Sequence, residues 1–522
     1  MSSTKSVANA PVVTQDRELE HNEIKVIMSA LMLALLLGAL DQTIVATALP
    51  KIANDLHGLS EYSWVATAYL LTSAVSTPLY GKISDMFGRK KIFQFSIVLF
   101  LIGSALCGLS QTMTQLIFFR GLQGLGAGGL MTLVFAIIGD VVPPRNRGRY
   151  QGYFGAVFAV SSVIGPLLGG VLTDDLSWRW VFYVNIPLGI LALSAIAARL
   201  HLPVRHVDHR IDWMGASLLG ISVTSLLLAT VWGGMTYPWG SSQIIGLFTT
   251  SIVGGIAFVI REHYAKEPII PLRLFRNSIF SVTTLLSLLV GAIMFGAIIF
   301  LPEYQQLVRG DSAIKSGLML MPLIMGVVVA SLTAGRLTSK IGKYRIFPII
   351  GSTLFVISLW LFSHIEVNTS RLTLGFWMVI LGVGVGMIMP ILTLAVQNAV
   401  ERKELGTATS SVVFFRSIGS ALGAAVFGAV LTNRLSHYIT QSLPASASAK
   451  VVAVIKQSLT GTAGLPKVDG ALILSAFAHA FRDVFLIGIP LGVLTLIVAF
   501  FLKDTPLRAS TREMAEGEGL EP

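Results

Sequence analysis

Long apolar runs alternate with short polar segments along almost the whole chain. A helix needs about 20 mainly apolar residues to cross a bilayer. On that template the pattern predicts fourteen membrane-spanning helices. Their approximate residue ranges are 25–49, 62–80, 92–109, 116–141, 151–172, 180–200, 213–233, 244–260, 279–301, 316–338, 346–362, 372–396, 407–431 and 484–502.

These spans predict an all-α integral membrane fold, with two six-helix bundles and two additional central helices. The bundles cover residues 25–200 and 279–502, and residues 201–278 form a linker that contains the central pair. We expect polar tails at 1–24 and 503–522, and a long loop at about 433–470. The first span follows a long polar segment and is full length, so we interpret it as permanent and not as a cleaved signal peptide.

Basic residues gather in alternate loops. Lys and Arg cluster within residues 82–91, 145–149, 205–210, 266–276, 336–345 and 402–403. The opposite loops carry isolated cations, namely Lys51, Arg179, Arg309, Lys315 and Arg371. Loops rich in Lys and Arg remain in the cytoplasm, so both termini are predicted to be cytoplasmic. The expected location is the cytoplasmic (inner) membrane.

Composition narrows the classes of function. Charged residues make up 12% of the chain and hydrophobic residues 53%, so lipid must be the solvent for much of its surface. The net charge of +11 lies in loops between spans, which excludes a nucleic-acid-binding domain. Cys107 is the single cysteine, and the spacing of His201, His206 and His209 fits no common metal template. No metal site or cofactor is therefore expected.

Two loops suggest an internal duplication. GKISDMFGRKK (residues 81–91) follows the second span, and GRLTSKIGKYR (335–345) follows the second span of the last six. Transporters built from two such halves bind substrate between them and alternate access by rocking. A pair of internal halves predicts a functional monomer rather than a channel assembled around a symmetric pore. Basic loops are common enough that a coincidental match is the alternative.

Several stretches resemble the major facilitator superfamily, and within it the fourteen-span drug:proton antiporters, which include multidrug and quaternary-ammonium exporters. Besides the loop at 81–91, they are LDQTIVATALP (40–50), LIFFRGLQGLGAGG (116–129), GYFGAVFAVSSVIGPLLGG (152–170) and FFRSIGSALG (414–423). Met86 stands where this family usually has arginine, and Ser161 replaces a glycine. The resemblance implies a proton-driven exporter that uses the proton gradient and no cofactor.

Asp41 and Arg120 are the predicted proton-coupling residues. Asp41 follows about fifteen apolar residues, and a charge at such depth marks a functional site by default. Both residues are expected roughly 10 Å below the outer face, so Arg120 could act on Asp41 directly or through Gln123. The alternatives are a purely structural ion pair and an Arg120 side chain that reaches the outer interface. The resemblance ties the arginine to proton transfer.

Two further motifs are expected to control conformation. Gly81, Asp85, Gly88 and Arg89 form a predicted latch, in which Asp85 accepts hydrogen bonds from a neighbouring helix N-terminus. Ser339 occupies the corresponding position of the second copy. The antiporter motif consists of Gly152, Gly165, Pro166, Gly169 and Gly170, and the resemblance implies close packing against the other half. A generic packing motif is the alternative.

Five polar residues are candidates for the substrate cavity: Gln42, Tyr69, Gln123, Glu303 and Arg416. Arg416 is expected near the middle of the bilayer, where it needs a partner or a water-filled cavity. Glu303 is a second cation or proton site, or an interfacial carboxylate.

The predicted function is proton-coupled antiport that exports small lipophilic, cationic drugs. The alternative is transport of a specific metabolite, lipid or siderophore. Sequence motifs of metalloproteases, serine hydrolases and P-loop proteins are absent, so the chain is not expected to be an enzyme.

Overall fold

The computed structural model describes residues 21–58, 61–200, 211–234, 236–442 and 470–507. Most residues in these ranges are helical, and the one β-type pairing among them is an isolated bridge between Gly233 and Tyr237. The predicted tails and the three histidines of the 201–210 segment lie largely or wholly outside the described residues.

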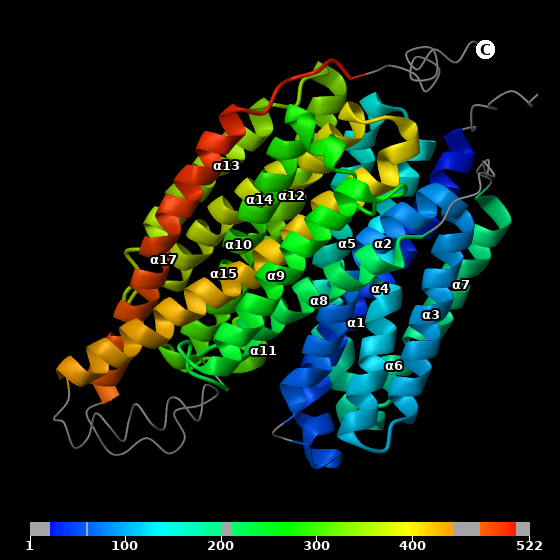
Figure 1. Ribbon diagram of the computed structural model, residues 1–522. Helices are drawn as coiled ribbons and strands as arrows, with labels where there is room; N and C mark the ends of the chain where they lie inside the picture. Colours follow the sequence, from blue (N-terminus) through cyan, green and yellow to red (C-terminus); the bar gives the residue numbers. More distant parts are fainter. Residues whose placement is uncertain (1–20, 59–60, 201–210, 235, 443–469, 508–522) are drawn as a thin grey trace, which may run out of the picture.

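The N-terminal half consists of consecutive antiparallel helices (Figure 1). They are α1 (His21–Asp55), α2 (Tyr62–Phe87), α3 (Arg89–Leu109), α4 (Met113–Val141), α5 (Pro144–Val171), α6 (Trp180–Tyr183) and α7 (Asn185–Arg199). A π-helical turn, η1 (Leu172–Leu176), extends α5. The predicted sixth span is interrupted at Val184, which separates α6 from α7.

The rest of the described chain contains the central pair and the C-terminal half. The central pair is α8 (Trp213–Trp232) and α9 (Ser242–Tyr264). The C-terminal helices are α10 (Ser278–Leu307), α11 (Ala313–Leu318), α12 (Met321–Ile341), α13 (Ile346–Phe362), α14 (Arg371–Ala399), α15 (Leu405–Ser442) and α17 (Gly470–Phe500). Short 3-10 turns, η2 (Leu272–Arg276) and η3 (Arg402–Glu404), precede α10 and α15.

Within the described residues, 12 helices are long and apolar enough to cross a membrane. Each predicted span overlaps at least one helix. However, α13 is too short to be counted among these 12, and α2 is not counted among them either. Ser and Thr at many positions lower the hydropathy of α2. A count of fourteen spans therefore stays a prediction.

The loop predicted at about 433–470 begins later in the structure than expected from the sequence. Residues 433–442 continue α15, and α17 begins at Gly470 instead of near 484. The polar end of α15 is helical because it pairs with α17: Arg434 Nε lies 3.2 Å from Asp483 Oδ2, and the Tyr438 hydroxyl donates to Asp483 at 2.9 Å.

Glycines let α4 lie in the middle of the N-terminal half. Gly124 and Gly128 face α2, whereas Gly126 and Gly129 face α3. A Cβ added to Gly126 would lie 2.7 Å from the Ser96 carbonyl oxygen, which is closer than side chains approach. The fourth-span signature thus sets the distance between backbones, in the way that small residues do in membrane bundles.

Gly126→Ala is expected to lower the thermal unfolding temperature of the purified protein, because α4 must move away from α3. Gly246→Ala is the matched control: Gly246 lies on α9 with nothing within 4 Å of an added Cβ. Alanine is the better helix former, so the control should leave the temperature unchanged or raise it. Equal effects of the two substitutions would contradict this packing argument.

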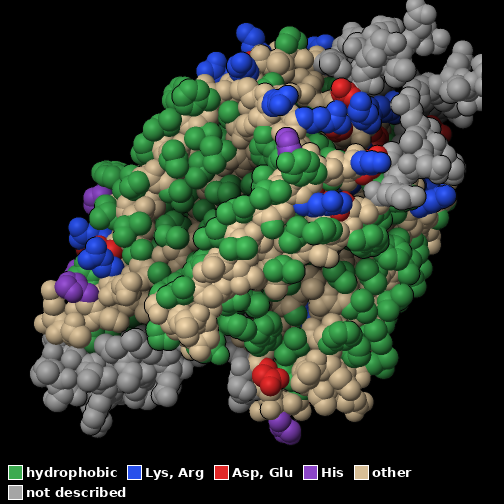
Figure 2. Space-filling model, viewed as in Figure 1, with side chains coloured by type: hydrophobic (Ala, Val, Ile, Leu, Met, Phe, Trp, Pro, Cys, Tyr) green, Lys and Arg blue, Asp and Glu red, His purple; other side chains and the backbone are tan. Residues whose placement is uncertain are grey.

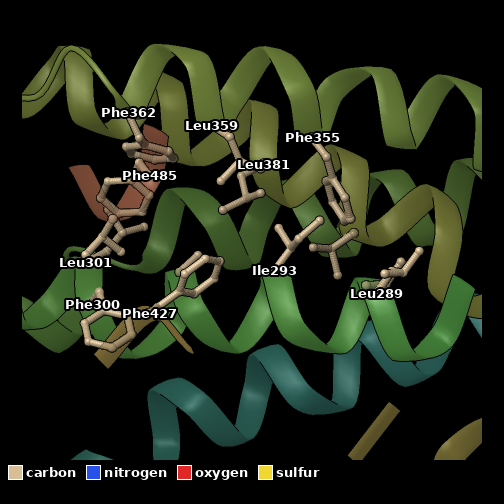
Figure 3. Close-up of a cluster of buried hydrophobic side chains, with 14 of the residues drawn as sticks. Leu289, Ile293, Phe300, Leu301, Phe355, Leu359, Phe362, Leu381, Phe427 and Phe485 are labelled. Carbon is tan, nitrogen blue, oxygen red and sulfur yellow. The ribbon is translucent and has the colours of Figure 1, made fainter. Parts of the chain in front are cut away.

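The core of the C-terminal half is built from large apolar side chains (Figure 3). Leu289 and Ile293 of α10 face Phe355 and Leu359 of α13, with Leu381 of α14 among them. Toward one end the cluster continues through the aromatic rings of Phe300, Phe362, Phe427 and Phe485. This half therefore has its own hydrophobic core, separate from that of the N-terminal half.

The outer surface matches a lipid environment. Figure 2 shows hydrophobic side chains over the flank, and most Lys and Arg side chains of this face gather toward the upper end. We call this end, which carries the basic residues of 82–91, 145–149, 336–345 and 402–403, the basic end. The two halves meet there and diverge toward the opposite end (Figure 1).

The central helices contact both halves. α8 packs on α9, on α2 of the N-terminal half and on α15 of the C-terminal half. Leu219 and Val223 of α8 share a buried cluster with Phe414 of α15, and Lys82 of α2 forms an ion pair with Glu267 at 2.6 Å. The pair α8–α9 therefore lies beside the seam between α2 and α15.

Candidate functional site

The Asp41 carboxylate is fully buried and is bonded by three side chains from other helices. Arg120 Nη1 lies 2.7 Å from Oδ2, Gln123 Nε2 donates to Oδ1 at 2.8 Å, and Asn185 Nδ2 donates to Oδ1 at 2.9 Å. Asp41 is 0% exposed and Arg120 is 2% exposed. The predicted link between the two residues is therefore confirmed as a direct contact.

Arg120 is held by further groups around the pair. Its Nη1 donates to Gln123 Oε1 at 2.7 Å, its Nε donates to the Val65 carbonyl at 3.2 Å, and its Cζ lies 4.2 Å from the centre of the Tyr69 ring. The alternative in which Arg120 reaches the outer interface is wrong, because burial and Asp41 hold the guanidinium inside the bundle.

Asn185 is a member of the cluster that was not predicted from sequence. It is the first residue of α7, and besides Asp41 its amide donates to Ser104 Oγ of α3 at 3.0 Å. The interruption at Val184 places Asn185 at a helix start, facing inward. A polar residue within an otherwise apolar span is the one hint that sequence offers.

Two of the five cavity candidates belong to this buried cluster. Tyr69 and Gln123 are inaccessible, so both contact Arg120 instead of lining an open cavity. Gln42 is exposed, and Glu303 and Arg416 are partly exposed. The structure therefore divides the predicted set into a buried pair and three residues that are at least partly exposed.

Removing one member of the Asp41–Arg120 pair should destabilise the fold strongly. A buried ion pair that loses one partner costs about 3–5 kcal/mol, because a charge remains uncompensated. We expect Arg120→Gln and Asp41→Asn each to lower the unfolding temperature, and the double variant to lose much less than their sum. Additive losses in this double-mutant cycle would show that the two charges are not coupled.

The predicted latch joins the two halves at the basic end. Asp85 lies in the last turn of α2, not in the loop, and its carboxylate accepts hydrogen bonds from the start of α15. The Gly406 and Thr407 amides donate at 3.0 and 2.7 Å, and the Thr407 hydroxyl donates at 2.8 Å. A carboxylate is favoured at this helix end by the unpaired amides and the helix dipole.

The other latch residues support Asp85. Arg89 Nη2 lies 2.8 Å from Asp85 Oδ1, and its Nε contacts Asp140 at the end of α4. Gly88 makes the α2–α3 turn with φ 93°, a conformation that favours glycine. Gly81 allows α2 to approach Ser410 of α15 closely. Sequence reasoning missed Asp140 and Thr407, which lie far from the loop signature in the chain.

A second set of contacts closes the same end. Gly148 and Gly152 of α5 pack against α12, and a Cβ added to Gly148 would lie 2.8 Å from the Gly335 carbonyl oxygen. Gln397 of α14 donates to the Phe135 carbonyl at 2.9 Å and accepts from Gln151 at 3.2 Å.

The antiporter motif therefore contacts two different partners. Gly152 packs on the other half, as the resemblance implied. Gly165 and Gly169 instead pack on Thr43 and Thr47 of α1, in their own half, and an added Cβ at Gly170 has nothing within 4 Å. Pro166 lies inside α5 between these glycines. Gly165 and Gly169 thus do not make the expected contact with the other half in this structure.

Loss of the Asp85 charge should loosen the basic end. In a Cys107→Ser background, Ser410→Cys places a thiol at a position that is buried beneath Gly81. We expect Asp85→Asn to raise its rate of maleimide labelling roughly tenfold, because caps of this kind are worth about 1 kcal/mol or more.

Ser339→Ala is the control, since Ser339 donates only to Gly335 within its own helix. An unchanged labelling rate in Asp85→Asn, or an equal rise in Ser339→Ala, would contradict the latch.

The arrangement is that of a helical membrane protein with two halves closed at one end and a buried charge cluster in one half. The family model of the Major Facilitator Superfamily matches residues 31–424, so the chain belongs to this superfamily. Its fold is the major facilitator fold, and the protein is a multi-pass transporter and not an enzyme.

Curated relatives point to efflux. The chain is 41% identical over 482 residues to an uncharacterized MFS-type transporter of Mycobacterium tuberculosis, covering 92% of this chain and 70% of that one. It is 41% identical to the multidrug transporter protein MdtP of Bacillus subtilis over 440 residues, 83% of this chain and 81% of the relative. Multidrug resistance protein 3 of the same organism is 42% identical over 418 residues, 80% and 81% of the two chains.

Solved structures share the fold. The proton:xylose symporter XylE superposes with a TM-score of 0.65 at 13% identity, covering 95% of this chain and 99% of that one. The human organic anion transporter MFSD10 gives 0.61 at 16% identity, with 91% and 100% covered.

Proposed function

We propose that the protein is a proton-coupled antiporter that exports small lipophilic molecules, cationic drugs among them, across the cytoplasmic membrane. The main support is the Asp41–Arg120 pair, a carboxylate with 0% exposure that has a matched cation and two amide donors. Efflux fits the relatives that are named multidrug transporters. The energy comes from the proton gradient, no cofactor takes part, and a monomer suffices.

Protonation of Asp41 would change the whole cluster. The amides of Gln123 and Asn185 still have an oxygen to donate to, whereas Arg120 loses its counter-charge. The guanidinium must then rely on Gln123 Oε1, the Val65 carbonyl and the Tyr69 ring. Val65 and Tyr69 belong to α2, so the proton alters the contacts of that helix.

Helix α2 connects this cluster to the latch. Asp85 lies 16 residues beyond Tyr69, or roughly 24 Å along the helix axis. In the proposal, α2, which contains Pro78, transmits a displacement at the Tyr69 end to the other end, where Asp85 binds the start of α15. In this mechanism external protonation of Asp41 biases the latch and discharges substrate, and deprotonation toward the cytoplasm resets the site.

The orientation follows the same proposal. The basic end, including both described chain ends, faces the cytoplasm, as the distribution of Lys and Arg favours. The latch and the contact between α5 and α12 then close the cytoplasmic side.

Substrate-induced proton release in proteoliposomes tests the proposal. Ethidium and a quaternary ammonium compound should each release protons from the wild type and not from Asp41→Asn. Asp483→Asn is the matched control, because this carboxylate pairs with Arg434 outside the cluster and should leave proton release intact. Proton release by Asp41→Asn at the wild-type level would refute the assigned role of Asp41.

A further inference from the structure

Arg416 differs from the buried arginines of this chain because, in the part that the structure describes, its side chain has neither a carboxylate nor a carbonyl partner. Arg120 and Arg89 pair with carboxylates, and Arg147 donates to the carbonyls of Val142 and Gly139. In the part of the chain that the structure describes, the polar contact of the Arg416 side chain is Met389 Sδ at 3.7 Å, and no Asp or Glu lies within ion-pair distance. A thioether is a weak acceptor and carries no charge.

Its position on α15 places this cation between the halves. Thr409, Val413 and Arg416 follow one face of the helix at helical spacing. Thr409 accepts from Gln397 at the closed basic end, and Val413 packs into the core cluster of the N-terminal half. Arg416 lies about 10 Å beyond Thr409 toward the opposite end, where the halves diverge (Figure 1). Along α15 it therefore lies beyond the residues that contact the other half at the closed end.

Close packing against α10 restricts movement of α15, and therefore of the Arg416 backbone. A Cβ at Gly291 of α10 would be 3.1 Å from the Arg416 carbonyl carbon, so the two backbones are in close contact at this level. Gly419 and Gly423 continue the close approach along α10. α15 is thus fixed against α10, and a cation at this depth without a counter-charge is expensive unless water or a ligand reaches it. The Arg416 side chain is not completely enclosed by the protein, since it is partly exposed.

We infer that Arg416 binds an acidic group of the transported molecule, such as a carboxylate or sulfonate. The inference rests on the proposed export function and adds a substrate class to it. The planar guanidinium offers a fork of donors that matches the two oxygens of such a group. A lipophilic acid or zwitterion thus places its anion at Arg416.

A lone cation is repelled from this position. Glu303, on the same helix as Gly291, is the carboxylate that remains available to a positive group. Twelve residues of α10, roughly 18 Å, separate the two levels. Cationic drugs and acidic amphiphiles therefore use different parts of the same space.

A matched pair of fluorescent probes tests the inference. Anilinonaphthalene sulfonate and phenylnaphthylamine share one aromatic skeleton, and only the first carries a sulfonate. Binding is measured by fluorescence titration of the full-length protein in nanodiscs, with empty nanodiscs subtracted. We expect Arg416→Gln to weaken binding of the sulfonate by about 10- to 100-fold, and that of the neutral probe by less than about twofold.

Arg416→Lys keeps the charge without the fork and should give an intermediate loss for the sulfonate alone. This variant also keeps the test decisive if Arg416→Gln does not fold. Equal losses for both probes, or unchanged sulfonate binding, would overturn the inference. Equilibrium binding needs no proton gradient, so a failure of antiport in proteoliposomes is a separate result.

Discussion

A carboxylate in a lipid-embedded bundle needs a compensating charge, and the Asp41–Arg120 pair determines how the N-terminal half is assembled. Asp41 comes from α1 and Arg120 from α4. Their neighbours Tyr69, Ser104 and Asn185 come from α2, α3 and α7. Five helices converge because the alternative is an unpaired ion in a medium of low dielectric constant. The glycines of α4 make this convergence possible, since they bring α2 and α3 within backbone contact.

The two halves contribute different polar groups to the structure. The N-terminal half holds the charge cluster and the Asp85 carboxylate, whereas the C-terminal half supplies the helix end that Asp85 caps. In the second copy of the loop, Ser339 bonds within its own helix and Arg145 donates to its carbonyl at 3.4 Å. The two similar loops therefore make different contacts. The helices α8 and α9, beside the α2–α15 seam, increase this asymmetry.

Much of the fold could be predicted from sequence because the bilayer imposes a single length and polarity on every span. The contact between Asp41 and Arg120 could also be predicted, from the depth of each residue in its helix. Asn185 and Gln397 could not, since their partners lie on helices far away in the chain. Gln123 was predicted both beside Arg120 and in the cavity, and Tyr69 only in the cavity, because helical position alone cannot distinguish a side chain buried against Arg120 from one that lines a cavity. The extra turns of α15 were missed because polar residues outside the bilayer resemble a loop until their pairing with α17 is seen.

Infrared difference spectroscopy of the purified protein tests most directly whether Asp41 exchanges a proton when substrate binds. We expect substrate addition to the proton-loaded protein to remove a protonated-carboxyl C=O band, and we expect this change to be absent in Asp41→Asn but present in Asp483→Asn. The same band change in Asp41→Asn would contradict the role assigned to Asp41, because the exchanged proton would then belong to another carboxyl group.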